Sequence, residues 1–348
     1  MSATRSWSPR PTGLGTSAAL IGVPRPADDP FPDLYCPEPI RDDEALGRLV
    51  NHRLAAWLRQ FGFGDEVIER FEAYDFGRFA MLAHPDTDDA DRLMATAAWT
   101  ATLTILDDHY VDDEQMGAAA ALLGERLTLA AIAIDPGHLP DPYHDELLQA
   151  VDADPILASL GAAVDLLGRY GTPGQLGRIR FENLGFFMGT TAEMTWRATG
   201  AMPPVWRYLA VRQVNSFLPC ITTCDLVGGY HIPDEVYHQP KVRRAVKLLA
   251  LTTVIVNDLY SMAKESAQDS ADGGLPVVVA AERGCPMPEA VAISVEIHNE
   301  VMRAFEAECR ELLLLAHPAL HRFLAGIHAW AGGCRAWHRD SVRFQVRS

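Results

Sequence analysis

Hydrophobic residues recur at helical spacing over most of the chain after residue 34. The segment 42–62 begins with acidic residues and then places Leu49, Leu54 and Trp57 at the spacings of an amphipathic helix. Similar patterns, separated by Pro, Asp and Gly, follow at 65–84, 117–134, 154–171 and 172–200. No hairpin signature and no repeat of fixed period stand out. The pattern predicts an all-α protein.

Two details of the pattern give narrower predictions. The strand-like run at 277–284 follows a proline and is expected to begin a helix. Pro219 lies inside the helical segment 203–229, where it is expected to break or kink the helix. We therefore expect one helical domain over residues 34–348.

Residues 1–33 differ in composition from the rest of the chain. They are rich in Pro, Gly and Ser and have no helical period, so we expect disorder. The short apolar stretch at 13–23 is either a docking peptide or part of a linker.

Length and composition restrict the class of protein. The chain has 348 residues, 48% hydrophobic, which is enough for a large core. A net charge of −16 argues against nucleic acid and anionic membranes as partners. The six cysteines show no zinc-binding spacing, and no secretory signal or membrane-length apolar run is apparent. These features indicate a reduced, cytoplasmic protein.

A polar stripe interrupts the apolar helical segment that precedes residue 257. Asn257, Ser261 and Glu265 follow one another at four-residue spacing, so they fall within about 80° on one helix face. Their amide, hydroxyl and carboxylate oxygens are ligands that suit Mg²⁺. Lys264 can direct a cation at the same anion. A polar face on an ordinary amphipathic helix is the alternative interpretation.

An acidic cluster ends another apolar segment at residues 107–114. Five of its eight residues are acidic, with Asp107 and Asp108 first and Asp112 about one turn later. Their mutual repulsion costs stability unless a multivalent cation joins them. A solvated acidic helix end is the alternative. If the two clusters face one another across a cavity, they can hold Mg²⁺ ions against a diphosphate.

The polar stripe at residues 257–265 resembles a motif of the class I terpene synthases. The family pattern (N/D)DxxSxxxE is matched at every fixed position, by Asn257, Asp258, Ser261 and Glu265. The resemblance implies a class I terpenoid synthase α-helical bundle surrounding an apolar active-site cavity. It also implies that three Mg²⁺ ions act as cofactors.

The aspartate-rich cluster is similar to the family pattern DDxxD, with one departure. Val111 stands where the last acid is usual, and Asp112 comes one residue later. The bacterial 2-methylisoborneol synthase branch of the family is similar to this variant. The resemblance implies that Asp107, Asp108 and Asp112 hold two Mg²⁺ ions, although Asp113 remains an alternative third acid. Asn257, Ser261 and Glu265 would hold the third ion.

The resemblance also implies cationic residues that bind the diphosphate. Arg212 lies 45 residues before Asn257 and is the candidate sensor of the diphosphate, with Asn215 and Ser216 in the helix break that follows. A guanidinium can bind two phosphate oxygens at once. A surface arginine is the alternative.

Near the C-terminus the family usually has Arg-Tyr, and here the pair is Arg343 and Phe344. Arg343 can still bind diphosphate, but Phe344 has no hydroxyl, which puts a second hydrogen bond in doubt. An exposed tail arginine is the alternative. Together with Lys264, the two arginines are the expected catalytic cations.

An apolar, aromatic wall is expected between the two clusters, because only π faces and the departing anion stabilise a carbocation. The candidates are Phe79, Trp99, Phe186, Phe187, Trp196, Trp330 and Trp337. Of these, Trp99, Phe187 and Trp330 are assigned to substrate binding, with core packing as the alternative. His109 is either a base or a helix-end hydrogen-bonding residue.

The resemblance runs from about residue 35 to the end of the chain and implies a substrate. The bacterial branch implies 2-methylgeranyl diphosphate, cyclised to a bornyl-type cation that water captures. Geranyl or farnesyl diphosphate remains an alternative substrate. A prenyl-chain-elongating enzyme, a helical phosphohydrolase and a non-catalytic cargo or scaffold protein remain alternative classes. The Pro-rich segment 1–33 resembles tails that load similar enzymes into encapsulin shells, and the family favours a homodimer.

Overall fold

The regular structure of the chain is helical throughout its described part. The computed structural model describes residues 29–112, 119–265 and 274–345, with the backbone alone for residue 112 and for residues 263–265. Every regular element in these ranges is a helix, which confirms the all-α prediction. The longest are α8 (Pro173–Thr199), α13 (Pro240–Glu265), α15 (Met287–Leu312) and α16 (Pro318–Asp340). The shorter ones are α1 (Glu44–Leu58), η1 (Arg59–Phe61), α2 (Asp65–Tyr74), α3 (Phe76–Ala83), α4 (Ala90–Asp107), η2 (Asp108–Asp112), α5 (Ala120–Ile134), α6 (Tyr143–Ala153), α7 (Pro155–Gly168), α9 (Val205–Arg212), α10 (Leu218–Ile221), α11 (Cys224–Val227), α12 (Asp234–Tyr237), α14 (Leu275–Arg283) and η4 (Val342–Phe344).

Local sequence signals explain where the main helices begin and end. The Asp89 side chain accepts hydrogen bonds from the first backbone N–H groups of α4. Thr172 and Gln175 form a capping box at the start of α8, with a proline in its first turn. Gly200 then ends α8 in the left-handed conformation, at φ 64°. The strand-like run at 277–284 lies in α14, as predicted.

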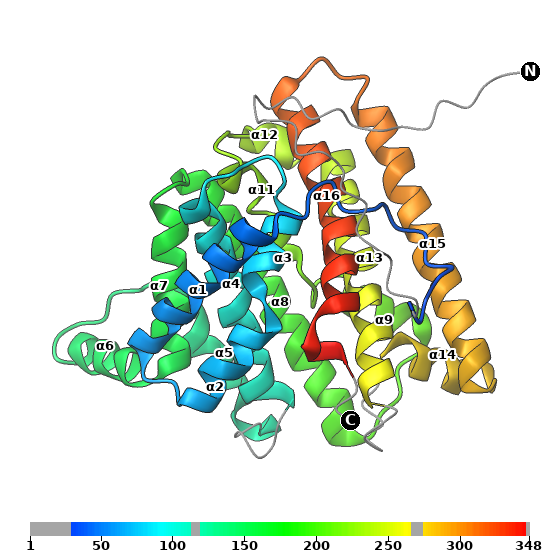
Figure 1. Ribbon diagram of the computed structural model, residues 1–348. Helices are drawn as coiled ribbons and strands as arrows, with labels where there is room; N and C mark the ends of the chain where they lie inside the picture. Colours follow the sequence, from blue (N-terminus) through cyan, green and yellow to red (C-terminus); the bar gives the residue numbers. More distant parts are fainter. Residues whose placement is uncertain (1–28, 113–118, 266–273, 346–348) are drawn as a thin grey trace, which may run out of the picture.

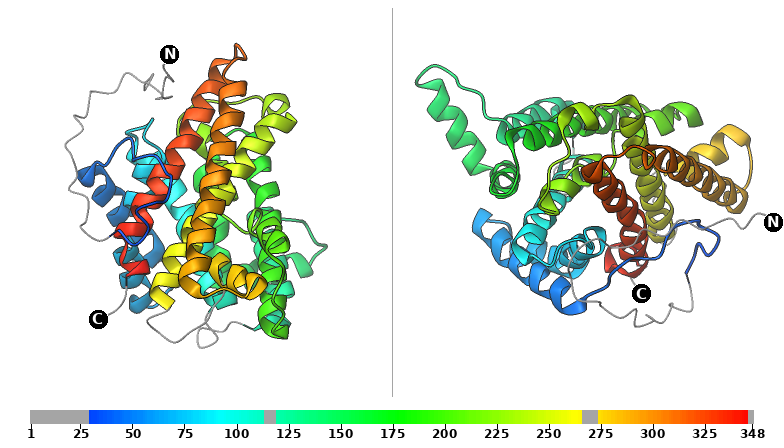
Figure 2. Two further views of the ribbon diagram at one scale, coloured as in Figure 1. Left: turned by 90° about the vertical axis from the view of Figure 1, so that its right-hand side faces the viewer. Right: turned by 90° about the horizontal axis from the view of Figure 1, so that it is seen from above.

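The helices are arranged around a common centre, and α13 is one of the innermost (Figure 1). It packs against α15 and α16, and α16 packs against α3. On the other side α4 contacts α3 and α7, while α10 contacts both α8 and α13. The view from above shows segments far apart in sequence side by side around this centre (Figure 2). The arrangement brings α4, α8, α13 and α16 to the same interior.

The helix break predicted at Pro219 lies just before that residue. α9 ends at Arg212, and α10 begins at Leu218 with Pro219 in its first turn. Proline is tolerated there because the first N–H groups of a helix have no intrahelical partner. Pro219 therefore starts a new helix, and the break itself spans residues 213–217.

Among the described residues, one helix has the length and apolarity of a membrane span, contrary to the expectation that no membrane-length apolar run is present. It is the stretch Pro240–Met262 of α13. Because α13 is in the middle of the bundle, 72% of its most apolar window is buried against other helices. A core helix meets the same criteria as a membrane span for this reason.

The N-terminal end of the described chain packs along α13 and α16. Asp29 accepts a hydrogen bond from Tyr260 Oη at 3.1 Å and pairs with Arg335 Nη2 at 2.8 Å. Phe31 is buried and meets the Tyr260 ring edge-on. The expected boundary at residue 33 thus falls within a packed segment, and residues 1–28 lie outside the described part of the chain.

Glycines permit the close approach of α3 to α1 and α16. A Cβ at Gly77 would lie 2.2 Å from the backbone N of Asn51 in α1. A Cβ at Gly333 of α16 would lie 2.8 Å from the backbone C of Leu82. Since backbone atoms cannot yield as a flexible side chain does, these contacts require glycine.

Gly77→Ala should therefore destabilise the protein, by about 1–3 kcal/mol, because α1 and α3 must move apart. Gly124→Ala is the matched control, since Gly124 is exposed in α5 and its added Cβ would meet nothing within 4 Å. That control should be neutral or stabilising by up to about 1 kcal/mol. Urea unfolding followed by circular dichroism measures both, and equal stability of the two variants would contradict the packing argument.

Candidate active site

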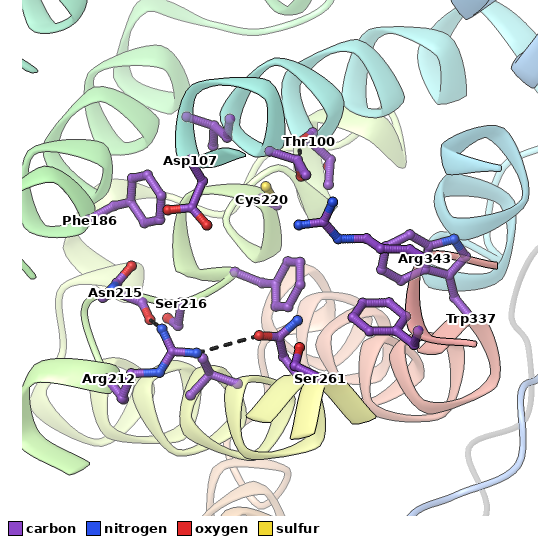
Figure 3. Close-up of a pocket in the computed structure, with 16 residues that line it drawn as sticks. Thr100, Asp107, Phe186, Arg212, Asn215, Ser216, Cys220, Ser261, Trp337 and Arg343 are labelled. Atoms are coloured by element: carbon purple, nitrogen blue, oxygen red, sulfur yellow. Dashed lines mark hydrogen bonds between the residues drawn. The ribbon is translucent and has the colours of Figure 1, made fainter. Parts of the chain in front are cut away.

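A cavity of ≈ 130 Å³ lies at the centre of the bundle and is lined by both sequence motifs. Its charged and polar lining includes Asp107, Arg212, Asn257, Ser261 and Arg343. Its aromatic lining consists of Phe186, Phe217, Trp337 and Phe344. Figure 3 shows Asp107 and Arg343 projecting into the cavity across from Arg212 and Ser261. Charged, polar and aromatic side chains therefore line the same cavity, which suits it to an anion with its counter-ions and to a hydrocarbon.

The two motifs reach the cavity from different helices. Asp107 is the last residue of α4, where the chain passes into the single π-helical turn η2. Such turns often mark functional positions, because they change the direction of side chains within a helix. Asn257 and Ser261 lie one turn apart on α13 and face the same cavity. The predicted convergence of the two motifs is present for these three residues.

Asp108 is held by an arginine from the other end of the chain. Arg343 donates from Nη2 to Asp108 Oδ1 at 2.7 Å and from Nη1 to Oδ2 at 3.0 Å. The Arg343 guanidinium also lies over the Tyr74 ring, 5.0 Å from its centroid. A two-pronged pair of this kind fixes both partners in orientation as well as in distance. It places η4 beside the start of η2.

Arg212 is fixed by a buried carboxylate of the second motif. Its Nη2 donates to Asp258 Oδ1 at 2.6 Å. The other Asp258 oxygen accepts from Tyr208 Oη at 2.9 Å and from the backbone N of Leu275 at 3.2 Å. Burial alone lowers the pKa of Arg212, but Asp258 and its neighbours raise it well above its ordinary value. The guanidinium therefore stays charged, and α9, α13 and α14 meet at this carboxylate.

The helix break after α9 is organised around the same arginine. Arg212 Nη1 donates to the backbone carbonyl of Asn215 at 3.2 Å and faces Glu193 Oε2 at 3.4 Å. Asn215 Nδ2 donates to the same carboxylate oxygen. Ser216 Oγ donates to Gln213 O and accepts from Leu218 N, which closes the turn. Asn215 and Ser216 both line the cavity, as the prediction for the break requires.

Asn257 is hydrogen-bonded on both sides of its amide. Its Oδ1 is 3.5 Å from Arg212 Nη2, and its Nδ2 is 3.2 Å from His338 Nε2. His338 is fully buried on α16, and this burial lowers its pKa to about 3. The imidazole is therefore neutral at ordinary pH.

The aromatic residues that line the cavity overlap only in part with the expected set. Of the three residues assigned to substrate binding, none lines the cavity as the described residues outline it. Trp99 is fully buried and donates from Nε1 to the Pro219 carbonyl, while Trp330 packs against Phe79. Phe187 is also buried, but its neighbour Phe186 faces the cavity, because successive helix residues point about 100° apart. Of the seven aromatic candidates, Phe186 and Trp337 line the cavity.

For three of the predicted site residues the structure describes the backbone alone, and for His109 it shows a hydrogen bond within the helix. Asp112 ends η2, and Lys264 and Glu265 end α13, but their side chains are outside the described part. Among the described side chains, no three of His, Cys, Asp or Glu lie close enough to hold a metal ion. His109 Nδ1 bonds the Ile105 carbonyl at 2.9 Å, which is the helix-end alternative.

Sequence reasoning gave no role to three residues that shape the site. Asp258, His338 and Phe217 were not assigned, although Asp258 was recognised as part of the motif. A carboxylate that follows the apolar run at 254–256 and precedes Leu259 on a core helix needs a cationic partner, so Asp258 carries a usable signal. His338 and Phe217 carried none, since their contacts depend on which helices become neighbours.

Comparison with known proteins places the chain among terpene synthases. Residues 98–304 match the family model described as terpene synthase family 2, C-terminal metal binding. The chain is 36% identical over 346 residues to the 2-methylisoborneol synthase of Streptomyces griseus, covering 95% of this chain and 78% of that protein. It is 33% identical to the 2-methylisoborneol synthase of Saccharopolyspora erythraea, covering 90% and 89%.

Solved structures agree with this placement. The 2-methylisoborneol synthase of Streptomyces coelicolor A3(2), in complex with Mg²⁺ and 2-fluoroneryl diphosphate, superposes with a TM-score of 0.85 at 33% identity. The match covers 91% of this chain and 98% of that one. The same enzyme with Mg²⁺ and geranyl-S-thiolodiphosphate gives a TM-score of 0.82. With both motifs lining one cavity and curated relatives matched over 78% and 89% of their length, this chain belongs to the terpene synthase family.

Proposed function

We propose that the protein is a Mg²⁺-dependent terpene cyclase that ionises a prenyl diphosphate and cyclises the resulting carbocation. The observation that carries the proposal is the convergence of Asp107, Asn257 and Ser261 on one cavity that also holds Arg212 and Arg343. Four aromatic side chains line the same cavity. An anion site adjoining an aromatic wall is the arrangement that ionisation of a prenyl ester requires.

The residues present fit magnesium as the cofactor. Asp107, Asn257 and Ser261 offer hard oxygen donors from two helices, and Mg²⁺ prefers such donors together with substrate phosphate. Asp108, Asp112 and Glu265 are the further ligands we propose, for a total of three ions. When bound, Mg²⁺ neutralises the diphosphate charge and makes it a better leaving group.

The two arginines bind and orient the diphosphate. Each guanidinium can donate two parallel hydrogen bonds to phosphate oxygens, which suits a group that must be held while its C–O bond breaks. Arg212 is already fixed by Asp258, so it is positioned before the substrate arrives. Arg343 is held by Asp108 and also lines the cavity, so its guanidinium would be available to the diphosphate. Lys264 is proposed to contact the same anion.

The aromatic wall protects and stabilises the cation. Phe186, Phe217, Trp337 and Phe344 present π faces or edges to the cavity. A π face attracts a cation by about 0.5–2 kcal/mol, and more strongly when water is excluded. These residues also bring no basic group into the cavity that could remove a proton early. The wall thus favours cyclisation over elimination.

The substrate we propose is 2-methylgeranyl diphosphate, and the product is 2-methylisoborneol. The S. griseus and S. erythraea relatives, named for this product, support the proposal. In the reaction the C–O bond to diphosphate breaks, the allylic cation closes to a bornyl-type cation, and water adds with loss of a proton. The products are 2-methylisoborneol and diphosphate. Geranyl or farnesyl diphosphate is the alternative substrate.

We further propose that the N-terminal segment loads the enzyme into an encapsulin shell. The segment 1–28 lies outside the described residues, and its Pro-, Gly- and Ser-rich sequence with one apolar stretch supports a docking role. Asp29, held by Tyr260 and Arg335, marks where the segment joins the helical domain. The resemblance to class I terpene synthases favours a cytoplasmic homodimer as the form that is loaded.

Asp107→Asn should reduce turnover by roughly 100-fold or more, because it removes one charge from the proposed metal site. Asp91→Asn makes the same change at the other end of α4, on an exposed residue paired with Arg53, and should leave turnover unchanged. Steady-state kinetics with a Mg²⁺ titration measures both. Full activity of Asp107→Asn would contradict the site. Absence of Mg²⁺-dependent diphosphate binding to the unmodified protein by calorimetry would favour the non-catalytic scaffold.

Incubation with each of three prenyl diphosphates tests the substrate. Gas chromatography of the volatile products should show 2-methylisoborneol from 2-methylgeranyl diphosphate, with a kcat/KM at least about 10-fold above those for geranyl and farnesyl diphosphate. One methyl group in an apolar pocket accounts for a difference of this size from geranyl diphosphate. Farnesyl diphosphate carries a further isoprene unit, which the same cavity would have to accommodate. Higher kcat/KM with geranyl or farnesyl diphosphate would assign the enzyme to that substrate instead.

Deletion of residues 1–28 tests the loading proposal without disturbing the Asp29 contacts. Co-expression with an encapsulin shell should yield loaded particles for the full chain and empty particles for the deletion, while the turnover of the free enzyme stays unchanged. A control that deletes residues 1–12 keeps the apolar stretch 13–23 and should still load. Unchanged loading of the longer deletion would refute the proposal.

A further inference from the structure

A chain of hydrogen bonds connects α16 to the proposed metal site through a buried histidine. His338 Nδ1 lies 2.8 Å from the carbonyl oxygen of Cys334, one turn earlier in the same helix. His338 Nε2 lies 3.2 Å from Asn257 Nδ2, and Asn257 Oδ1 lies 3.5 Å from Arg212 Nη2. We propose that His338 is a positioning residue that fixes the Asn257 amide with its oxygen toward the cavity. This inference rests on the proposed role of Asn257 as a metal ligand.

The groups at the two ends of this series of hydrogen bonds determine which atom donates and which accepts in each of them. The Cys334 carbonyl can only accept, so His338 Nδ1 carries the proton and donates. Nε2 lies 3.2 Å from the Asn257 NH₂ group, which can only donate, so Nε2 carries no proton and accepts. At the other end the Arg212 guanidinium can only donate, so the group facing it must be the Asn257 oxygen. Both ends require the same orientation of the amide.

Such a constraint matters because an asparagine side chain has two similar ends. Rotation of the Asn257 amide by half a turn would present its NH₂ group to a cation, which binds oxygen and is repelled by a donor. Aspartate or glutamate ligands have no such difficulty, since both of their oxygens accept. Among the proposed metal ligands, Asn257 has the amide side chain. The nitrogen of this amide lies against the buried His338.

Packing keeps the imidazole in this orientation. The His338 ring centroid is 4.4 Å from that of Phe344 and 4.9 Å from that of Trp337, and the residue is fully buried. Phe344 has no hydroxyl that could compete for either ring nitrogen. Because both nitrogens are engaged and His338 is not part of the cavity lining, it acts through Asn257 and does not contact the substrate.

The first test reads the tautomer directly in the metal-free protein. Two-dimensional ¹H–¹⁵N spectra that correlate ring nitrogens with ring carbon-bound protons distinguish the Nδ1–H from the Nε2–H form. We expect His338 as the neutral Nδ1–H tautomer. An Nε2–H tautomer would overturn the inference, because Nε2 could not then accept from Asn257. This readout needs neither metal nor activity.

The second test compares two substitutions of His338 by an amide side chain. Each keeps a different one of the two hydrogen bonds that the imidazole makes. In His338→Gln the longer side chain can still place an acceptor near Asn257, whereas in His338→Asn the amide reaches only the Cys334 carbonyl. We expect the Mg²⁺ concentration for half-maximal turnover to rise roughly 10- to 100-fold in His338→Asn. His338→Gln should stay within a few-fold of the unmodified enzyme. An equal effect of both changes, or no effect of His338→Asn, would overturn the proposal.

Calorimetry separates failure of this inference from failure of the proposed function. Mg²⁺ with inorganic diphosphate should bind the unmodified protein and His338→Gln with similar affinity, and His338→Asn about 10-fold more weakly or worse. If the unmodified protein does not bind, the proposed function fails. If all three bind equally, the function stands and the positioning role of His338 is wrong. Should His338→Asn fail to fold, the tautomer measurement decides.

Discussion

The site depends on holding positive charge inside a largely buried space before any substrate is present. A buried guanidinium without a partner carries a large desolvation cost, so each arginine at the cavity is paired with a carboxylate. Arg212 is paired with Asp258 within the second motif, and Arg343 with Asp108 within the first. The two pairs tie α9 and the C-terminal turn η4 to the two motifs. Anion-binding groups and proposed metal-binding groups therefore line the same cavity.

The mixed lining of the cavity explains how it can meet two opposite requirements of the reaction. Breaking the ester requires strong, fixed charges around the diphosphate, while the carbocation requires an environment without nucleophiles. Asp107, Asn257 and Ser261 meet the first demand from α4 and α13. Phe186 and Trp337 help to meet the second from α8 and α16. The helix break at residues 213–217 follows Arg212 in the chain and adds Phe217 to the aromatic lining of the cavity.

Much of this site could be predicted from sequence because its key residues are local to single helices. Four-residue spacing places Asn257 and Ser261 on one helix face whatever surrounds the helix. The aromatic wall could not be predicted in the same way: Phe186 lines the cavity and Phe187 does not, and only the packing of α8 decides between them. The contact of Asp29 with Arg335 joins residues 306 positions apart, and no local pattern indicated it. Asp258 is intermediate in predictability. A charged residue on a core helix indicates that a cationic partner exists, but it does not identify that partner as Arg212.

The most direct test of the account is where metal binds. Crystals grown with Mn²⁺ and inorganic diphosphate, measured near the manganese absorption edge, locate each ion independently of the refined coordinates. The account predicts anomalous peaks beside Asp107 and beside Asn257 and Ser261, with the diphosphate between them and within reach of Arg212 and Arg343. Diphosphate bound elsewhere, or peaks at neither motif, would contradict the claim that the two motifs form one metal–diphosphate site.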